Sequence, residues 1–546
     1  MLLPAARGRI PPVMAGSRNR HPGASSLRRW AAATTVVWLL AASVAGAQPF
    51  RLLEATIDGV HAALASGELT CRALVQGYLE RIEAYDQGGP ALNAIQHVNP
   101  RALERARTMD AAFAESGPVG PLHCVPVLLK DQVETREMPT TYGSALFAGF
   151  VSGRDATIVA RMRDAGAIIL AKTNMGEFAS RYVGSAFGVI RNAYDPTRNP
   201  SGSSGGTGAG VAANFSLVGI GEDTGGSIRG PAAVHSLVGL RPTVPLVSRF
   251  GMMPANPSSD TLGPMTRTVR DAAIVLDAIA GYDPNDPVTA YAAARLPDSY
   301  AAMLDAEALR GARIGVIRES MDPKTDPESD DYRQVRAVID RAIADLRSLG
   351  AVVVDPVTVA GLASAQRTYV ANSFETEEAM NAYLAELPNA PMETVRNILV
   401  SGVVTPWRAR GLINVVGKST EDRGYLAVLR ARERLRRSVL TTMADHALDA
   451  LVYATFDHQP ALIAPDALTN ADTQDAYALG NNRYLSPVIG FPALTVPAGL
   501  TADGLPVGLE LLGRPFTETT LLGLGYAYEQ GTRRREPPAT TPALDR

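Results

Sequence analysis

Short apolar runs that alternate with amphipathic helical patterns constrain the fold of this chain more than any other feature. The run 125–129 has the length of a buried strand, a helical pattern covers 156–165, and a second apolar run follows at 167–171. A strand, a helix and a second strand in this order favour parallel pairing in an α/β layer. The alternation returns between residues 216 and 355, and again from 450 to 530.

The alternation continues without a repeat of fixed period and without a low-complexity linker. The sequence therefore predicts an α/β fold built as one large domain, residues 48–535. Segment 360–446 carries helical patterns and few strand signals, so we expect a mostly helical elaboration of that domain. The end of the chain is rich in Arg, Pro and Thr, and we expect residues 536–546 to form a flexible tail.

The first 47 residues differ from the rest of the chain in charge and hydropathy. They hold six Arg and no acid, and their apolar stretch, 30–47, ends in an A-x-A site. Together these features predict a secretory signal peptide, residues 1–47, cleaved before Gln48. An uncleaved anchor is the alternative, because about 18 apolar residues just span a bilayer. We expect an exported protein, periplasmic or secreted, with no stable membrane insertion after cleavage.

Composition excludes some classes of function. Removing the signal peptide leaves 52 − 6 = 46 basic residues against 55 acids, so the net charge moves from −3 to −9. No block of like charge points to nucleic acid. Export would permit a disulfide between Cys71 and Cys124, but two buried thiols are the interpretation that we favour. No cluster of Cys and His has zinc spacing, so we expect no metal.

Positive charge in this chain is almost entirely Arg, because only four of the 52 basic residues are lysines: Lys130, Lys172, Lys324 and Lys418. Arg stays protonated at any working pH, whereas burial can make a lysine neutral. A lysine retained in such a chain is a candidate for chemistry that Arg cannot perform. The apolar run before Lys130 would bury it, and a surface ion pair with Asp131 is the alternative.

Two segments combine glycine and serine at unusual density: PSGSSGGTGAG at 200–210 and EDTGGSIRGP at 222–231. Such glycines let a backbone turn sharply and approach a ligand closely. A phosphate-binding loop fails because no Gly-Lys-Ser/Thr is present. A nucleophile elbow centred on Ser204 is an alternative, although the stretch before it does not resemble a strand. Its base would be one of three downstream histidines: His235, His446 or His458.

Six motifs in the same order resemble the amidase signature family: LHCVP at 122–126, SGSSGG at 201–206, DTGGSIR at 223–229, GPMTRT at 263–268, PALTVPAG at 492–499 and GLPVG at 504–508. The resemblance runs from about residue 51 to 530. It implies a single large domain with a central mixed β-sheet flanked by helices. It also implies an enzyme that hydrolyses carboxamide, or acyl–nitrogen, bonds without a cofactor.

The resemblance implies a catalytic role for several of these residues. Ser227 would attack the amide carbonyl and form a covalent acyl-enzyme. Ser203 would pass protons between Ser227 and Lys130, the base, in a Ser-cisSer-Lys triad. Four backbone N–H groups would form the oxyanion hole: those of Thr224, Gly225, Gly226 and Ser227.

Two positions depart from the family's pattern. Cys124 stands where a glycine is usual before Val-Pro, and Glu222 stands where the family often has a small hydroxyl residue. Glu222 precedes the oxyanion segment, where it could ion-pair with Arg229 or face away. Lys172 lies in a segment that the family shares, and we interpret it as structural.

We expect an amidase whose partner is a small-molecule or peptide amide, acting outside the cytoplasm. Export argues against the family's cytosolic role in transamidating acylated tRNA, which needs partner subunits. A serine esterase of Ser-His-Asp type and a non-catalytic binding protein on an amidase scaffold are the alternatives. Segment 360–446 and the loop 181–190 would shape the pocket, and the sequence leaves the oligomeric state open.

Overall fold

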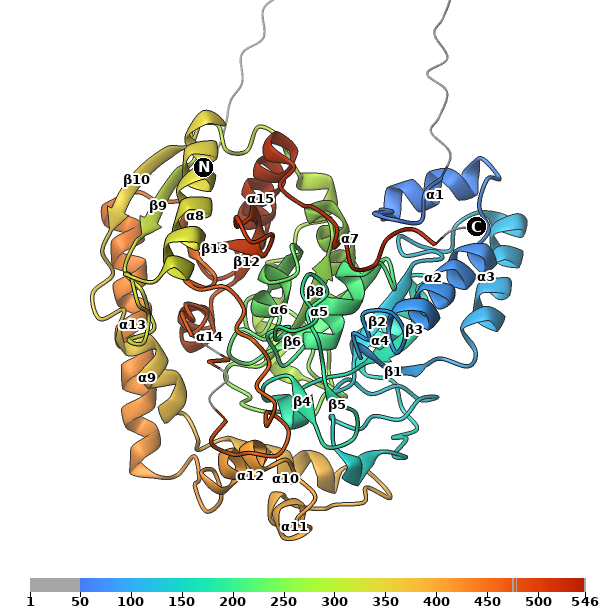
Figure 1. The fold of residues 1–546 in the computed structure, drawn as a ribbon, viewed down its shortest axis with the longest axis horizontal. Helices are drawn as coiled ribbons and strands as arrows, with labels where there is room; N and C mark the ends of the chain where they lie inside the picture. Colours follow the sequence, from blue (N-terminus) through green and yellow to red (C-terminus); the bar gives the residue numbers. More distant parts are fainter. Residues whose placement is uncertain (1–49, 474–475, 478, 545–546) are drawn as a thin grey trace, which may run out of the picture. The chain divides into compact units, whose positions relative to one another are not determined.

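The computed structural model describes residues 50–473, 476–477 and 479–544 (Figure 1). In this part of the chain, eleven strands form one sheet in the order β1-β3-β2-β6-β8-β7-β12-β13-β11-β9-β10. Helices surround this sheet, which confirms the prediction of a single large α/β domain with a mixed sheet. The signal peptide expected at 1–47 lies outside the described residues.

The strands of the large sheet are β1 (Ile95–Val98), β2 (Pro126–Lys130), β3 (Ile168–Thr173), β6 (Val218–Asp223), β7 (Val238–Arg241), β8 (Thr261–Thr266), β9 (Arg313–Ile317), β10 (Val352–Val357), β11 (Ala450–Ala454), β12 (Ala493–Leu500) and β13 (Pro506–Leu512). Strand β2 runs parallel to β3 and β6, and β9 runs parallel to β10 and β11. The strands between these groups pair antiparallel, so the sheet is mixed. A short separate ribbon joins β4 (Val183–Gly184) to β5 (Gly188–Val189).

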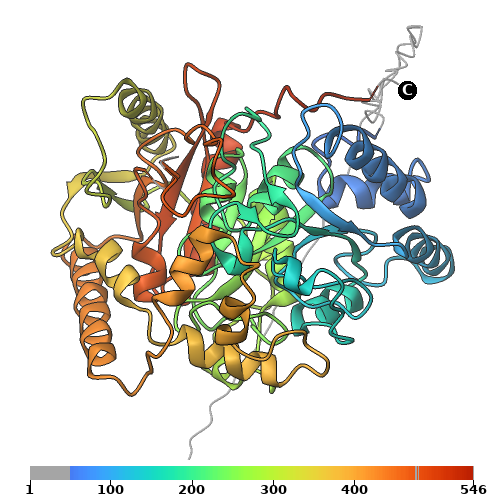
Figure 2. The ribbon, with the colours of Figure 1, turned by 60° about the horizontal axis from the view of Figure 1, so that its bottom comes forward.

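The helices are α1 (Ile57–Ala65), α2 (Cys71–Tyr85), α3 (Ala102–Ser116), α4 (Thr157–Asp164), α5 (Gly205–Ala212), α6 (Arg229–Ala233), α7 (Val269–Ile279), α8 (Asp330–Ser348), α9 (Ser364–Ala371), α10 (Thr376–Ala385), α11 (Val395–Val400), α12 (Pro406–Ile413), α13 (Arg423–Asp445), α14 (Leu485–Ile489) and α15 (Glu518–Thr532). Figures 1 and 2 show α1, α2 and α3 beside the β1–β3 end of the sheet, and α8, α9 and α13 beside the β9–β10 end. Helices α9 to α13 all come from segment 360–446.

Capping and periodicity explain why the longer helices form where they do. In α8, the Ser329 side chain accepts the N–H of Tyr332, and two aspartates in the first turn complement the helix dipole. Apolar residues at helical spacing, from Val335 to Leu346, turn one buried face toward the sheet. Helices α1, α2 and α7 begin in the same way, each at a threonine whose side chain accepts a first-turn N–H.

The two strands at the centre of one half of the sheet, β2 and β6, are buried along their whole length. Strands covered on both faces have nearly continuous apolar sequences, which is why the run at 125–129 predicts β2. The carboxyl ends of these parallel neighbours lie side by side, because Leu129 is paired with Ile220. Residues that follow this pair therefore come close together in space.

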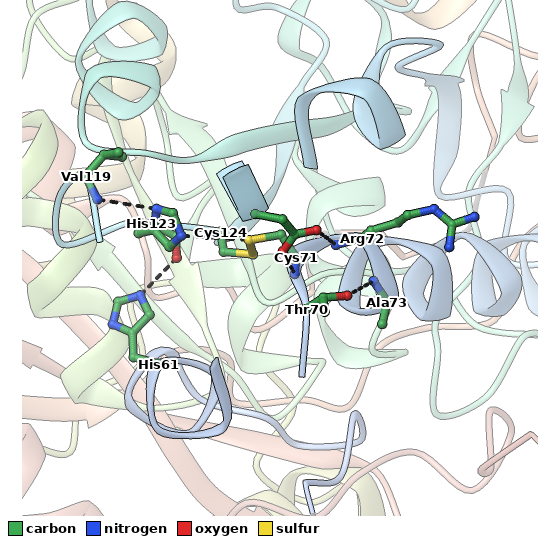
Figure 3. The surroundings of a disulfide bond; sticks show 9 residues. His61, Thr70, Cys71, Arg72, Ala73, Val119, His123 and Cys124 are labelled. Atoms are coloured by element: carbon green, nitrogen blue, oxygen red, sulfur yellow. Dashed lines mark hydrogen bonds between the residues drawn. A yellow bond between two sulfur atoms is a disulfide. The ribbon is translucent and has the colours of Figure 1, made fainter. Parts of the chain in front are cut away.

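The two cysteines form a disulfide, so the prediction of two buried thiols is wrong. Cys71 begins α2 and Cys124 lies in the turn before β2, and their Cα atoms are 5.4 Å apart (Figure 3). Cys124 has φ +66°, in the left-handed region that favours glycine. This backbone conformation explains why a glycine would fit at position 124. Here a cysteine adopts it, and its side chain forms the bond to Cys71.

The C-terminal segment 536–544, for which the sequence predicts a flexible tail, contacts the rest of the domain. The guanidinium of Arg81 donates hydrogen bonds to the carbonyl oxygens of Thr541 at 2.8 Å and Pro542 at 2.7 Å. The same side chain donates to the carbonyls of Ala213 and Asn214, at the end of α5. Among the described residues, no helix has the length and apolar character needed to cross a membrane.

Candidate active site

Lys130 ends β2 with its side chain entirely buried. Its Nζ lies 2.8 Å from Ser203 Oγ and 2.7 Å from Glu222 Oε2. Successive side chains of a strand point to opposite faces, so Asp131 turns away and pairs with Lys172 at 3.2 Å. The alternative of a surface ion pair between Lys130 and Asp131 is therefore wrong. Lys172 is also fully buried, and burial lowers its pKa.

Ser203 lies just before α5, in a loop held by close backbone contacts. Its carbonyl accepts the N–H of Gly176 at 3.1 Å, and the preceding peptide bond, Gly202–Ser203, is cis. A Cβ atom at Gly202 would lie 1.8 Å from the carbonyl oxygen of Arg181. Only glycine therefore fits at position 202, directly before Ser203.

Ser227 lies in the turn between β6 and α6. The carboxylate of Asp223 shapes this turn by accepting the N–H groups of Gly226 at 2.7 Å and Ile228 at 3.1 Å. The N–H of Gly226, expected in the oxyanion hole, is therefore engaged by Asp223. Within the described residues, the N–H groups of Gly225 and Ser227 have no acceptor, and Ser227 as a whole residue retains 8% exposure.

Two arginines hold Asp223 in place. Burial, the largest influence, acts to raise the pKa of Asp223, but the charges of Arg229 and Arg241 outweigh it and lower that pKa. Arg229 Nε lies 3.2 Å from Asp223 and also pairs with Glu510, while Arg241 Nη1 lies 3.0 Å from Asp223. The turn that carries Ser227 is thus anchored by a buried, charge-balanced cluster.

Glu222 adopts neither of the two arrangements that the sequence suggests. It does not contact Arg229, and it does not face away, because its carboxylate binds Lys130 Nζ inside the protein. Its second carboxylate oxygen accepts a hydrogen bond from Thr224 Oγ1 at 2.5 Å. The order of β2 and β6 in the sheet, which the sequence does not reveal, brings Glu222 and Lys130 together.

Two further residues at the site could not be predicted from the sequence, because they lie far along the chain from the glycine-serine segments. Arg483 Nη1 donates to the carbonyl oxygen of Gly226 at 3.0 Å and lies 3.1 Å from Ser201 Oγ, so it links the two glycine-serine segments. Tyr369, from α9, packs on Gly225, where a Cβ atom would lie 2.4 Å from its ring. Neither residue stands in a motif with a recognisable spacing.

The nucleophile elbow at Ser204 lacks the base that it requires. Ser204 Oγ donates to the carbonyl of Glu222 at 3.2 Å, and Ser204 is fully buried. His235 binds the carbonyl of Pro231 at 2.7 Å, and burial lowers its pKa to about 4. His458 pairs with Asp331 at 2.8 Å. In the described part of the chain, no histidine hydrogen bonds to Ser204.

Comparison with known proteins shows which family this chain resembles. The family model described as Amidase matches residues 73–522. The chain is 38% identical to a glutamyl-tRNA(Gln) amidotransferase subunit of Moorella thermoacetica over 495 residues, 86% of this chain and 95% of that protein. It is 32% identical to a probable amidase of Arabidopsis thaliana over 517 residues, 90% of this chain and 92% of the other.

Solved structures agree with the sequence comparison. The native peptide amidase from Stenotrophomonas maltophilia superposes with a TM-score of 0.80 at 36% identity, covering 90% of this chain and all of that one. An amidase family protein from Bacillus anthracis superposes with a TM-score of 0.76 at 32% identity, covering 89% and 92%. The chain therefore belongs to the amidase signature family, enzymes that act on the carbon–nitrogen bonds of amides.

Proposed function

We propose that this enzyme hydrolyses carboxamides outside the cytoplasm through an acyl-enzyme on Ser227, with Ser203 as proton relay and Lys130 as base. The observation that carries the proposal is the 2.8 Å hydrogen bond between Lys130 Nζ and Ser203 Oγ, in a site where both side chains are buried. An amide is a weak electrophile with a poor leaving group, so hydrolysis needs an activated nucleophile and a proton donor.

Each residue then has a defined role in the reaction. Ser227 Oγ attacks the carbonyl carbon while its proton passes to Ser203, whose own proton passes to Lys130 Nζ. The negatively charged oxygen that forms accepts hydrogen bonds from the N–H groups of Gly225 and Ser227. Lys130 returns its proton through Ser203 to the departing nitrogen as the carbon–nitrogen bond breaks. Water then repeats the sequence on the acyl-enzyme and frees Ser227.

Likeness to a peptide amidase at 36% identity over 90% of the chain supports peptide amides as the substrates to test first. The name of the Moorella relative, an amidotransferase subunit, points to an enzyme that works within an assembly. We favour hydrolysis by this chain without such partners, because residues 1–47 have the features of a signal peptide. The Cys71–Cys124 disulfide supports export, since disulfides persist in oxidising compartments.

The test is release of ammonia or amine from a panel of peptide amides, short aliphatic amides, anilides and matched esters. Wild-type protein starting at Gln48 is compared with Lys130→Ala, Ser203→Ala and Ser227→Ala. Ser204→Ala is the matched control, because Ser204 is a buried neighbour of Ser203 whose hydroxyl only binds the backbone of Glu222. Labelling of Ser227 by a fluorophosphonate probe reports the nucleophile directly.

The proposal expects amide turnover in wild type and loss of about a thousandfold or more in the three triad variants. Lys130→Ala keeps some ester turnover, because an ester leaving group needs less help from a proton donor. Full activity of Lys130→Ala, or loss of activity in Ser204→Ala alone, would overturn it. Localisation is tested separately by N-terminal sequencing of the mature protein from the periplasm or medium.

A further inference from the structure

A buried carboxylate lies against the base of the proposed triad. Lys130 Nζ has three acceptors: Ser203 Oγ at 2.8 Å, Glu222 Oε2 at 2.7 Å and the carbonyl of Glu222 at 3.3 Å. An ammonium group carries three hydrogens, and this arrangement offers each of them a partner. The side chains of Lys130 and Glu222 both have no exposure to solvent.

We propose that Glu222 is a positioning residue that acts through Lys130, holding Nζ against Ser203 and neutralising the ammonium formed when Lys130 accepts a serine proton. The inference rests on the proposed role of Lys130 as base. In the step concerned, one proton moves from Ser203 Oγ to Lys130 Nζ and later returns to the leaving nitrogen. Glu222 stays a carboxylate throughout, and no bond to it forms or breaks.

Burial of Lys130 and Glu222 makes the charge that develops on Lys130 costly. A positive charge that develops in a site without solvent is strongly unfavourable unless a partner compensates for it. A carboxylate at 2.7 Å supplies this compensation at the moment when Lys130 becomes charged. A carboxylate in contact with an amine stabilises a positive charge there, so we expect activity to extend to lower pH when Glu222 is replaced.

The other ionisable groups that interact with Glu222 come from three elements: Arg241 of β7, Asp260 of the segment before β8, and Tyr369 of α9. Burial lowers the pKa of Arg241, and burial raises the pKa of Tyr369 well above its ordinary value. Burial, with the charge of Glu222, raises the pKa of Asp260 to about 7. Asp260 is thus the neighbour whose titration must be distinguished from the effect of replacing Glu222.

The experiment measures kcat/KM against pH with the best carboxamide of the panel, for wild type, Glu222→Gln and Glu222→Thr. Threonine supplies the small hydroxyl residue that the family often has at this position, so this variant provides a second test if Glu222→Gln folds poorly. Asp260→Asn removes the group that titrates near neutrality without touching Lys130. Glu134→Gln is the matched control, a buried carboxylate that pairs with Arg154 at 2.6 Å and is not among the hydrogen-bond partners of Lys130 Nζ.

In both Glu222 variants we expect the alkaline plateau of kcat/KM to fall about tenfold or more. We also expect the acidic limb to move toward lower pH by about one unit or more. A role in folding alone would lower the plateau and leave the limb in place. An unmoved limb in Glu222→Gln and Glu222→Thr, or the same shift in Asp260→Asn or Glu134→Gln, would overturn the inference.

Ser227→Ala and Lys130→Ala separate this inference from the proposed function. If both variants lose amide turnover while Glu222→Gln keeps the wild-type profile, Glu222 has no positioning role and the triad stands. If Ser227→Ala or Lys130→Ala stays active, the proposed mechanism itself fails. The fluorophosphonate probe, applied to each Glu222 variant, shows that Ser227 is still in place.

Discussion

The guanidinium of Arg483 donates a hydrogen bond to the carbonyl oxygen of Gly226 at 3.0 Å. Through a second contact, at 3.1 Å to Ser201 Oγ, the same group fixes the distance between the turn of the proposed nucleophile and the loop of the proposed relay. Its Nε binds the side-chain oxygen of Asn481 at 2.8 Å, which sets the direction of the guanidinium. One planar side chain therefore aligns two loops that sequence separates.

Replacement of Arg483 by lysine should disturb this alignment. A lysine ammonium cannot span both acceptors in the planar geometry of a guanidinium. We expect kcat to fall about tenfold to a hundredfold with a smaller change in KM, because alignment matters most in the chemical step. Steady-state kinetics measure this, with Arg161→Lys as control, since Arg161 also binds several backbone carbonyls, those of Ile279, Ala280 and Gly281. Equal losses in the two variants would argue against a role for Arg483 in alignment.

The two fully buried lysines of the described chain should respond differently to replacement by arginine. Lys130→Arg should lose amide turnover by about a thousandfold or more, because a guanidinium cannot give up its proton to act as base. Lys172→Arg should keep turnover per folded molecule within about tenfold, since Arg still pairs with Asp131, while the larger side chain costs about 1–3 kcal/mol of stability. Turnover is measured alongside thermal unfolding, and an active Lys130→Arg enzyme would remove the lysine from the mechanism.

The disulfide should contribute strongly to stability. Cys71 and Cys124 are 53 residues apart, and in the chain-entropy model a loop of this length is worth about 4 kcal/mol. Urea unfolding of the protein with and without reductant should show a loss of this size. The double variant Cys71→Ser, Cys124→Ser, insensitive to reductant, is the control. Titration of two free thiols in the denatured, unreduced protein would show that the bond is not formed.

Stability should fall on the acidic side of neutrality because of His235. Burial lowers the pKa of His235 to about 4 in the folded protein, below its ordinary value of 6.5. The unfolded chain thus binds a proton first, so this contribution is complete above pH 6.5 and is lost as pH falls toward 4. We expect about 2 kcal/mol to be lost between pH 7 and pH 5 from this group.

Replacement of His235 by glutamine should flatten this dependence on pH, while lowering stability at pH 7 through its lost hydrogen bond to the carbonyl of Pro231. Urea unfolding at several pH values measures both effects. His446, which is exposed at the end of α13, is the control position, and His446→Gln should keep the wild-type slope. An unchanged slope in His235→Gln would exclude His235 as the source.

The sequence predicted those parts of the site that depend on local pattern. The apolar run before Lys130 predicted a buried strand, which is present as β2. The glycines of 222–231 predicted a sharp backbone turn, which is present between β6 and α6. Helix α5 was not predicted, because five of its first six residues are Gly or Thr, types that are weak helix formers. Glycine is required at 206 because the helix packs on backbone there, and a Cβ atom would lie 2.3 Å from the carbonyl oxygen of Asn174.

Contacts that depend on the order of strands could not be predicted from the sequence. The Lys130–Glu222 pair requires β2 and β6 to be neighbours, and the Cys71–Cys124 bond requires α2 to lie at the start of β2. Strand β8 was missed because it contains Gly263 and Pro264, residues that are depleted in strands. In each case the cause is long-range packing, which local sequence pattern does not reveal.

The strand order also has a consequence for how the chain is made. Strands β12 and β13, from residues 493–512, lie between β7 and β11 and join the two halves of the sheet. A nascent chain that ends before residue 493 therefore holds two half-sheets, each with an unpaired edge that invites aggregation. The sheet can be completed only when the last tenth of the polypeptide has been made. A truncation near the C-terminus therefore removes strands from the middle of the sheet and not from its edge.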